Sequence, residues 1–95
     1  MYRLKIMDKE EQIILEYSNL KLIAKNNYVK ILRLEVDPKY SVDVDHPDYV
    51  EFYIFKSGIV KERNFEWHKD KKIGSHYTGD DCTKYELLEC ERVDA

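Results

Sequence analysis

Apolar and polar residues alternate with a period of two over most of this chain. In the first segment, residues 2–7, Leu4 and Ile6 alternate with Arg3 and Lys5. Successive side chains of a β-strand point to opposite faces, so this alternation predicts a strand with one buried and one wet face. The same criterion predicts six strands in all, at residues 2–7, 12–17, 20–25, 28–36, 49–55 and 59–67.

The connections between these segments are short, which favours hairpins. Residues 8–11 are a polar turn, Ser18-Asn19 interrupts the pattern, and Asn26-Asn27 predicts a two-residue hairpin turn because Asn tolerates positive φ. Two longer polar stretches, residues 37–48 and 68–79, contain both prolines and two of the three glycines and are predicted to be loops.

The last segment, residues 84–93, is ambiguous. It can be a seventh strand, or a terminal helix that begins at a capping box formed by Thr83 and Glu86. The composition favours strands, because the 95 residues include eight Tyr and only two Ala. We therefore predict one domain over residues 1–95, mainly β, with a small antiparallel sheet of about six strands in a meander sandwich or an open barrel.

Hydropathy and cysteine content point to the cytoplasm. No segment is apolar for long enough to cross a bilayer, and the first residues lack the apolar block of a signal peptide. Cys82 and Cys90 are too far apart on one strand or one helix for a disulfide between them, so we predict free thiols in an intracellular protein.

Charge is segregated although the net charge is only −3. Residues 37–55 hold five carboxylates and one lysine, whereas residues 56–77 hold six Lys or Arg and three carboxylates. Such segregation is typical of a domain that presents an acidic patch and a basic patch. Lys outnumbers Arg by twelve to four, which together with the abundant Ile and Tyr is typical of AT-rich coding sequences in low-GC bacteria and their phages.

The acidic stretch is the first candidate site. Its carboxylates repel one another and can attract a partner with a basic surface. The oxygens of Asp43, Asp45 and Asp48 could instead bind a hard cation, but the loop lacks the Gly and Glu of an EF-hand. We predict protein docking and no metal or cofactor. The predicted protein-binding residues are Asp43, Asp45, His46, Asp48, Tyr49 and Tyr53.

The two tyrosines enter this list because of the alternation in residues 49–55. Val50, Phe52 and Ile54 form the better core face, which leaves Tyr49, Tyr53 and Phe55 on the opposite face, exposed or covered by a partner. A second apolar layer of the fold explains the pattern equally well. Homodimerisation through this face is a further possibility, since Tyr is enriched at protein interfaces.

The basic stretch is the second candidate site. Cationic groups neutralise phosphates and aromatic faces stack on unpaired bases, so residues 56–77 could bind single-stranded nucleic acid. The three carboxylates in this stretch and the acidic pI weaken that interpretation. The residues predicted to carry it are Lys61, Arg63, Trp67, Lys69, Lys71 and Lys72.

No motif for catalysis is present. The sequence lacks a Gly-rich phosphate loop, G-x-S-x-G and H-E-x-x-H, and nothing fixes the geometry of His68 and His76. We predict a non-enzymatic protein-binding module that docks through its acidic loop and surface tyrosines. A phage-encoded or mobile-element-encoded inhibitor of a host protein is the specific hypothesis, and single-stranded nucleic-acid binding is the alternative.

Overall fold

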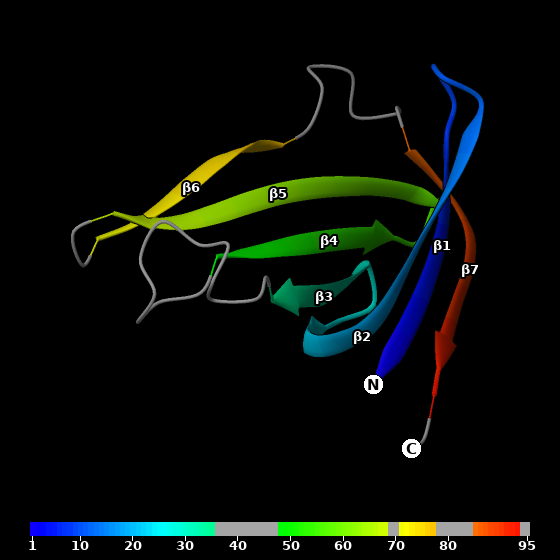
Figure 1. Cartoon of the computed structure of the whole chain (residues 1–95). Helices are drawn as coiled ribbons and strands as arrows, with labels where there is room; N and C mark the ends of the chain where they lie inside the picture. Colours follow the sequence, from blue (N-terminus) through cyan, green and yellow to red (C-terminus); the bar gives the residue numbers. More distant parts are fainter. Residues whose placement is uncertain (36–47, 69–70, 78–84, 94–95) are drawn as a thin grey trace.

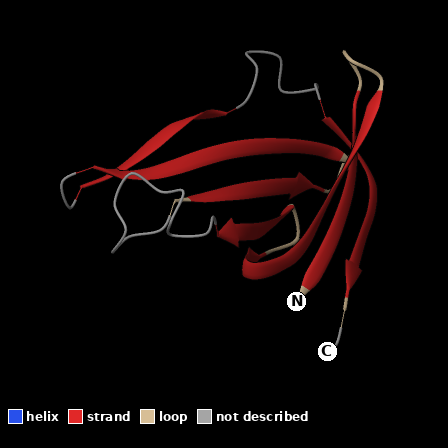
Figure 2. Cartoon of the chain, viewed as in Figure 1, coloured by secondary structure: helices blue, strands red, loops and turns tan. Residues whose placement is uncertain are grey.

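The computed structural model describes residues 1–35, 48–68, 71–77 and 85–93, with the backbone alone for 66–68 and 71–77. Every regular element in these residues is a strand (Figure 2), so no helix there is long and apolar enough to cross a membrane. The strands are β1 (Tyr2–Asp8), β2 (Ile13–Lys25), β3 (Val29–Glu35), β4 (Tyr49–Phe55), β5 (Ile59–His68), β6 (Lys71–Tyr77) and β7 (Tyr85–Arg92).

Six of the strands form a small closed barrel. Each of the strands β1 to β5 pairs antiparallel with the next one in the chain, and β7 lies between β5 and β1 (Figure 1). The prediction of a small antiparallel β domain is confirmed, and the sheet closes on itself. β6 is added to β5, where the two strands continue as a hairpin beyond β7.

Closure depends on the first residues of β5. Val60 is opposite Ile54 of β4 on one side and Tyr85 of β7 on the other. The turn before β5 adds a further bond, since the backbone N–H of Leu87 donates to the carbonyl of Gly58 at 2.8 Å. Because β5 pairs with both neighbours here, neither β4 nor β7 presents a free edge at this level of the barrel.

The inward positions of the strands fill the barrel. Its core consists of Leu4, Ile6, Leu20, Leu32, Phe52, Ile54, Val60 and Tyr85. Phe52 is fully buried, and the centroid of its ring lies 4.7 Å from the centroid of the Tyr17 ring. Side chains fill the interior of a barrel of this size, so a ligand must bind at an outer face or at an end.

One predicted boundary is wrong, because residues 12–17 and 20–25 belong to a single strand. β2 runs through Ser18-Asn19, pairing first with β1 and then with β3. Asn19 has a φ of 63°, and the register with β1 shifts at this point. The residues that suggested a break therefore form a bulge, which bends one long strand from one neighbour to the next.

The predicted loop at 68–79 is also wrong, since most of it is β6. Hydrophobic alternation predicts a strand only where one face of that strand is buried. The backbone hydrogen bonds of a hairpin form without a buried face, so a strand such as β6 can lack the alternation. Within the ambiguous segment 84–93, residues Tyr85–Arg92 form the strand β7 and not a helix. The predicted loop at 37–48 lies outside the described residues except for Asp48.

The β2–β3 turn forms by a different mechanism from the one expected. Neither Asn26 nor Asn27 has a positive φ. Instead the side-chain oxygen of Asn26 accepts hydrogen bonds from the backbone N–H groups of Tyr28 and Val29, at 2.8 and 3.0 Å. The N–H of Asn26 donates to the carbonyl of Val29. Asn26 thus closes the turn with its side chain, as an Asx turn does.

The bulge in β2 generates a stability prediction. At a φ of 63° a Cβ crowds the following carbonyl, and Asn tolerates this conformation better than Ala. We expect Asn19→Ala to lower the free energy of unfolding by about 1 kcal/mol, and Asn19→Gly to change it by less than about 0.5 kcal/mol. Urea unfolding monitored by circular dichroism measures both, and equal losses for Ala and Gly would contradict the role of the bulge.

Candidate nucleic-acid interface

The outer face of β4 is more closely packed than the sequence suggested. The inward positions are as predicted, with Phe52 and Ile54 in the core. On the outward side, however, Tyr49 and Glu51 are only 7% and 8% exposed. The expectation that Tyr49 is available to a partner is therefore wrong, because its own chain covers it.

Two arginines and two aromatic rings form a stack on this face. The guanidinium of Arg33, on β3, lies 4.1 Å from the centroid of the Tyr49 ring. Tyr49 stacks on Phe65 of β5 with 4.8 Å between centroids and 17° between planes. The guanidinium of Arg63 lies 5.0 Å from the Phe65 ring. Both cation–ring distances are within the range of a cation–π interaction.

A carboxylate lies at the centre of the stack. Glu51 is opposite Arg33 on β3 and Arg63 on β5 in the strand register. Its Oε2 is 3.6 Å from a terminal nitrogen of Arg33, and the hydroxyl of Tyr53 donates to its Oε1 at 3.5 Å. A buried carboxylate is tolerated when cations neutralise it, so Glu51 and the arginines hold one another in place.

Beyond the stack the face continues with Lys61 and Phe55. The Lys61 ammonium lies 5.1 Å from the centroid of the Phe55 ring, and both residues are half-buried. We call Arg33, Lys61 and Arg63 together the cationic face. It combines positive charge with aromatic surface over the neighbouring strands β3, β4 and β5, although Tyr49 and Phe65 are themselves buried.

At the end of the barrel beside Phe55 there is an open hollow of about 240 Å³. We call it the end hollow. It lies between the β2–β3 turn and the β4–β5 turn, and none of the described residues that line it is acidic. They are Lys25, Asn26, Asn27, Tyr28, Val29, Lys30, Ile54, Phe55, Lys56 and Leu87.

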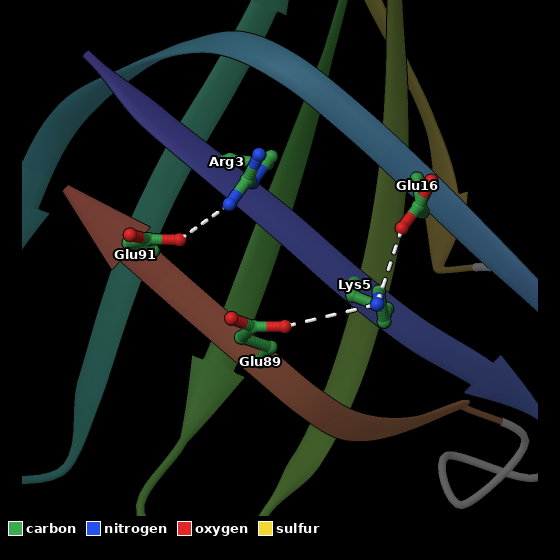
Figure 3. A network of polar contacts seen from close by, with 5 residues as sticks. All are labelled: Arg3, Lys5, Glu16, Glu89 and Glu91. Atoms are coloured by element: carbon green, nitrogen blue, oxygen red, sulfur yellow. Dashed lines mark hydrogen bonds and ion pairs between the residues drawn. The ribbon is translucent and has the colours of Figure 1, made fainter. Parts of the chain in front are cut away.

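The outer face of β1, β2 and β7 has a different character, because its two cations form ion pairs with three carboxylates (Figure 3). Arg3 pairs with Glu91 at 2.6 Å, and Lys5 lies 3.3 Å from Glu16 and 3.8 Å from Glu89. These partners are opposite each other in the strand register. Such exposed pairs are typical of a solvated sheet face and contribute little to stability.

The residues predicted for protein docking are only partly described. Asp43, Asp45 and His46 lie outside the described residues, and Asp48 lies half-buried just before β4. Tyr53 is half-buried beside Glu51, whereas Tyr49 belongs to the stack. The structure therefore leaves the acidic docking loop as a prediction.

Of the predicted nucleic-acid residues, Lys61 and Arg63 are brought together on the cationic face. Trp67 is opposite Lys72 in the β5–β6 register, and Lys71 is opposite His68. Only the backbone of these four residues is described, and Lys69 lies outside the described residues.

Sequence reasoning missed the contribution of Lys25, Lys30, Tyr28 and Lys56 to a common site. They lie on separate strands and turns, and only the closed topology brings them to one end of the barrel. The sequence Asn26-Asn27-Tyr28 could have indicated one of these residues, because a tyrosine next to a predicted turn is expected to be exposed to solvent.

Cys90 is a free, half-buried thiol. Burial raises its pKa above the ordinary value, and the charge of Lys30 opposes that shift. A thiol in this state is a poor nucleophile. No group of three or more His, Cys, Asp or Glu residues that could bind a metal ion occurs within the described ranges.

Comparisons with protein-family models, with curated proteins and with solved structures found no match.

The stack generates a stability prediction. In Arg33→Met the acidic Glu51 loses its ion-pair partner while it stays buried, so we expect the free energy of unfolding to fall by about 1–3 kcal/mol. Arg3→Met is the matched control, because its pair with Glu91 is exposed, and it should leave urea unfolding unchanged within error. Equal effects of the two substitutions would contradict a structural role for the Arg33–Glu51 pair.

Proposed function

We propose that this protein binds a macromolecule without catalysing a reaction, and that the macromolecule is a single-stranded nucleic acid bound across the cationic face. The observation that carries the proposal is the association of Lys61 with the half-buried ring of Phe55, with Arg63 two residues further along the same strand. Cations placed beside aromatic surface suit a ligand that carries phosphates and unpaired bases together.

The charge distribution supports a polyanion as the ligand. On β1 and β7 the carboxylates Glu89 and Glu91 are paired with cations of the same face, so that face is close to neutral. On the outward face of β3 to β5 the three cations accompany two carboxylates, Glu51 and Glu35, and Glu35 pairs with Lys21 of β2. Because salt screens charges over about 8 Å, the local excess of positive charge matters more for binding than the net charge of the chain.

The shape of the molecule argues for a polymer over a small molecule. The interior of the barrel is filled with side chains, and the end hollow, at about 240 Å³, is open and smaller than a usual site for a drug-sized ligand. A chain of nucleotides can lie along an outer face and make many weak contacts. Fold class alone does not establish this function, so the proposal rests on the side chains of the face.

Protein docking through the acidic loop, including inhibition of a host protein, remains the main sequence-based alternative. Asp48 and Tyr53 are the members of that predicted site that are described and not fully buried. The two hypotheses differ in the sign of the charge that binds the partner, so one titration separates them.

The test is fluorescence anisotropy of a labelled oligothymidylate of about twelve nucleotides, titrated at several salt concentrations. We expect binding at low salt that weakens with a log–log slope of about −0.7 for each phosphate neutralised. A duplex of equal length should bind less tightly, because its bases are not available for stacking. If the wild-type protein binds no oligonucleotide at low salt, the proposed function is wrong.

Substitution of Lys61 tests the location of the interface. Lys61→Gln should weaken binding about fivefold at ~0.1 M salt and reduce the slope by about 0.7, since one phosphate contact is lost. Lys61→Arg keeps the charge and should bind as the wild type does. Lys9→Gln, an exposed lysine in the turn between β1 and β2, is the control for a general loss of charge. Equal effects at Lys9 and Lys61 would place the interface elsewhere.

A further inference from the structure

The end hollow combines unpaired cations with an exposed aromatic ring. Lys25 and Lys56 are exposed, and neither forms an ion pair with any residue that the structure describes. The Lys30 ammonium lies 5.5 Å from the centroid of the Tyr2 ring. Tyr28 is 76% exposed, the highest value among the large exposed hydrophobic residues of the described chain.

Two of these lysines are placed against each other. In the pairing of β2 with β3, Lys25 is directly opposite Lys30. Like charges directly opposite in an antiparallel pair are destabilising. An anion that binds between them would relieve this repulsion, so the free protein holds an arrangement that favours a negatively charged ligand.

The backbone holds Tyr28 in its exposed position. The N–H of Tyr28 donates to the side chain of Asn26, and its carbonyl accepts from the N–H of Lys56 at 3.0 Å. The turn is therefore fixed on both sides of the ring. Because the backbone of Tyr28 is already ordered, a ligand that stacks on the ring orders the side chain alone, which favours binding.

The end hollow is continuous with the cationic face. Phe55 lines the hollow and also carries Lys61 over its ring. A chain of nucleotides that contacts Lys61 can therefore pass over Phe55 into the hollow without crossing an acidic residue of the described lining.

We propose that the end hollow is a nucleotide subsite, in which Lys25, Lys30 and Lys56 bind a phosphate of a single-stranded nucleic acid and Tyr28 stacks on an adjacent base. This inference rests on the proposed function and assigns to it residues outside the basic stretch that the sequence suggested. The occupant follows from charge complementarity and from the pairing of cations with an exposed ring.

The test uses the same labelled oligothymidylate with substitutions in the hollow. Tyr28→Ala should weaken binding about 5- to 150-fold, the range found when a stacked aromatic residue is removed. Tyr28→Phe keeps the stacking face and should bind within about twofold of the wild type. Lys56→Gln should reduce the salt slope by about 0.7, and Lys9→Gln should not change it. Circular dichroism checks that each variant is folded.

The outcomes separate this inference from the proposed function. If Tyr28→Ala and Lys56→Gln bind as the wild type while Lys61→Gln weakens binding, the subsite is wrong and the interface on the cationic face stands. If the wild type binds no oligonucleotide, the function fails and the subsite with it. If polyglutamate competes as well as the oligonucleotide does and Tyr28→Ala has no effect, the hollow is a general anion site and the assignment to nucleic acid is overturned.

Discussion

Closure of the sheet at β5 is the constraint on which the rest of the molecule depends. Val60 lies opposite Ile54 and Tyr85 on the two neighbouring strands, and all three residues belong to the core. A strand that pairs on both sides at this point satisfies the backbone groups of β4 and β7 together, and it turns their apolar faces toward a single interior. The order of the strands then determines which outward residues become neighbours.

The same closure leaves binding to the outside of the barrel. Phe52 and Leu32 are fully buried, and the interior that they help to fill has no room for a ligand. The outward charges of β1 and β7 form ion pairs with one another, whereas the outward residues of β3 and β5 include Arg33, Lys61 and Arg63 beside Glu51 of β4. The proposed binding of a polyanion is compatible with a net charge of −3, because salt screens the charges on the other side of the barrel.

The sequence predicted those features that depend on a buried face. Leu4 and Ile6 alternate with charged residues because one side of β1 faces the core, and this alternation can be read directly from the chain. The bulge at Asn19 could not be distinguished from a break, since both use the same residue types. β6 was missed because pairing through the backbone leaves no hydrophobic pattern in the side chains.

The candidate site was predicted only where it follows one strand. Lys61 and Arg63 are two residues apart on β5, so their common face follows from strand geometry. Lys25, Lys30 and Lys56 are brought together by three strands and two turns, and no local pattern contains that information. Their proximity depends on the order of the strands, which hydrophobic periodicity does not determine.

The tyrosines illustrate why residue composition alone does not locate an interface. Three of the six with described side chains pack within the fold: Tyr85 is in the core, Tyr17 packs on Phe52, and Tyr49 stacks between Arg33 and Phe65. Tyrosine suits these positions because its ring packs while its hydroxyl reaches a polar partner or water. Tyr28 differs, because the turn fixes its backbone while its side chain is 76% exposed. An exposed ring among lysines can stack on a planar group while the lysines bind its negative charge, as the proposed subsite requires.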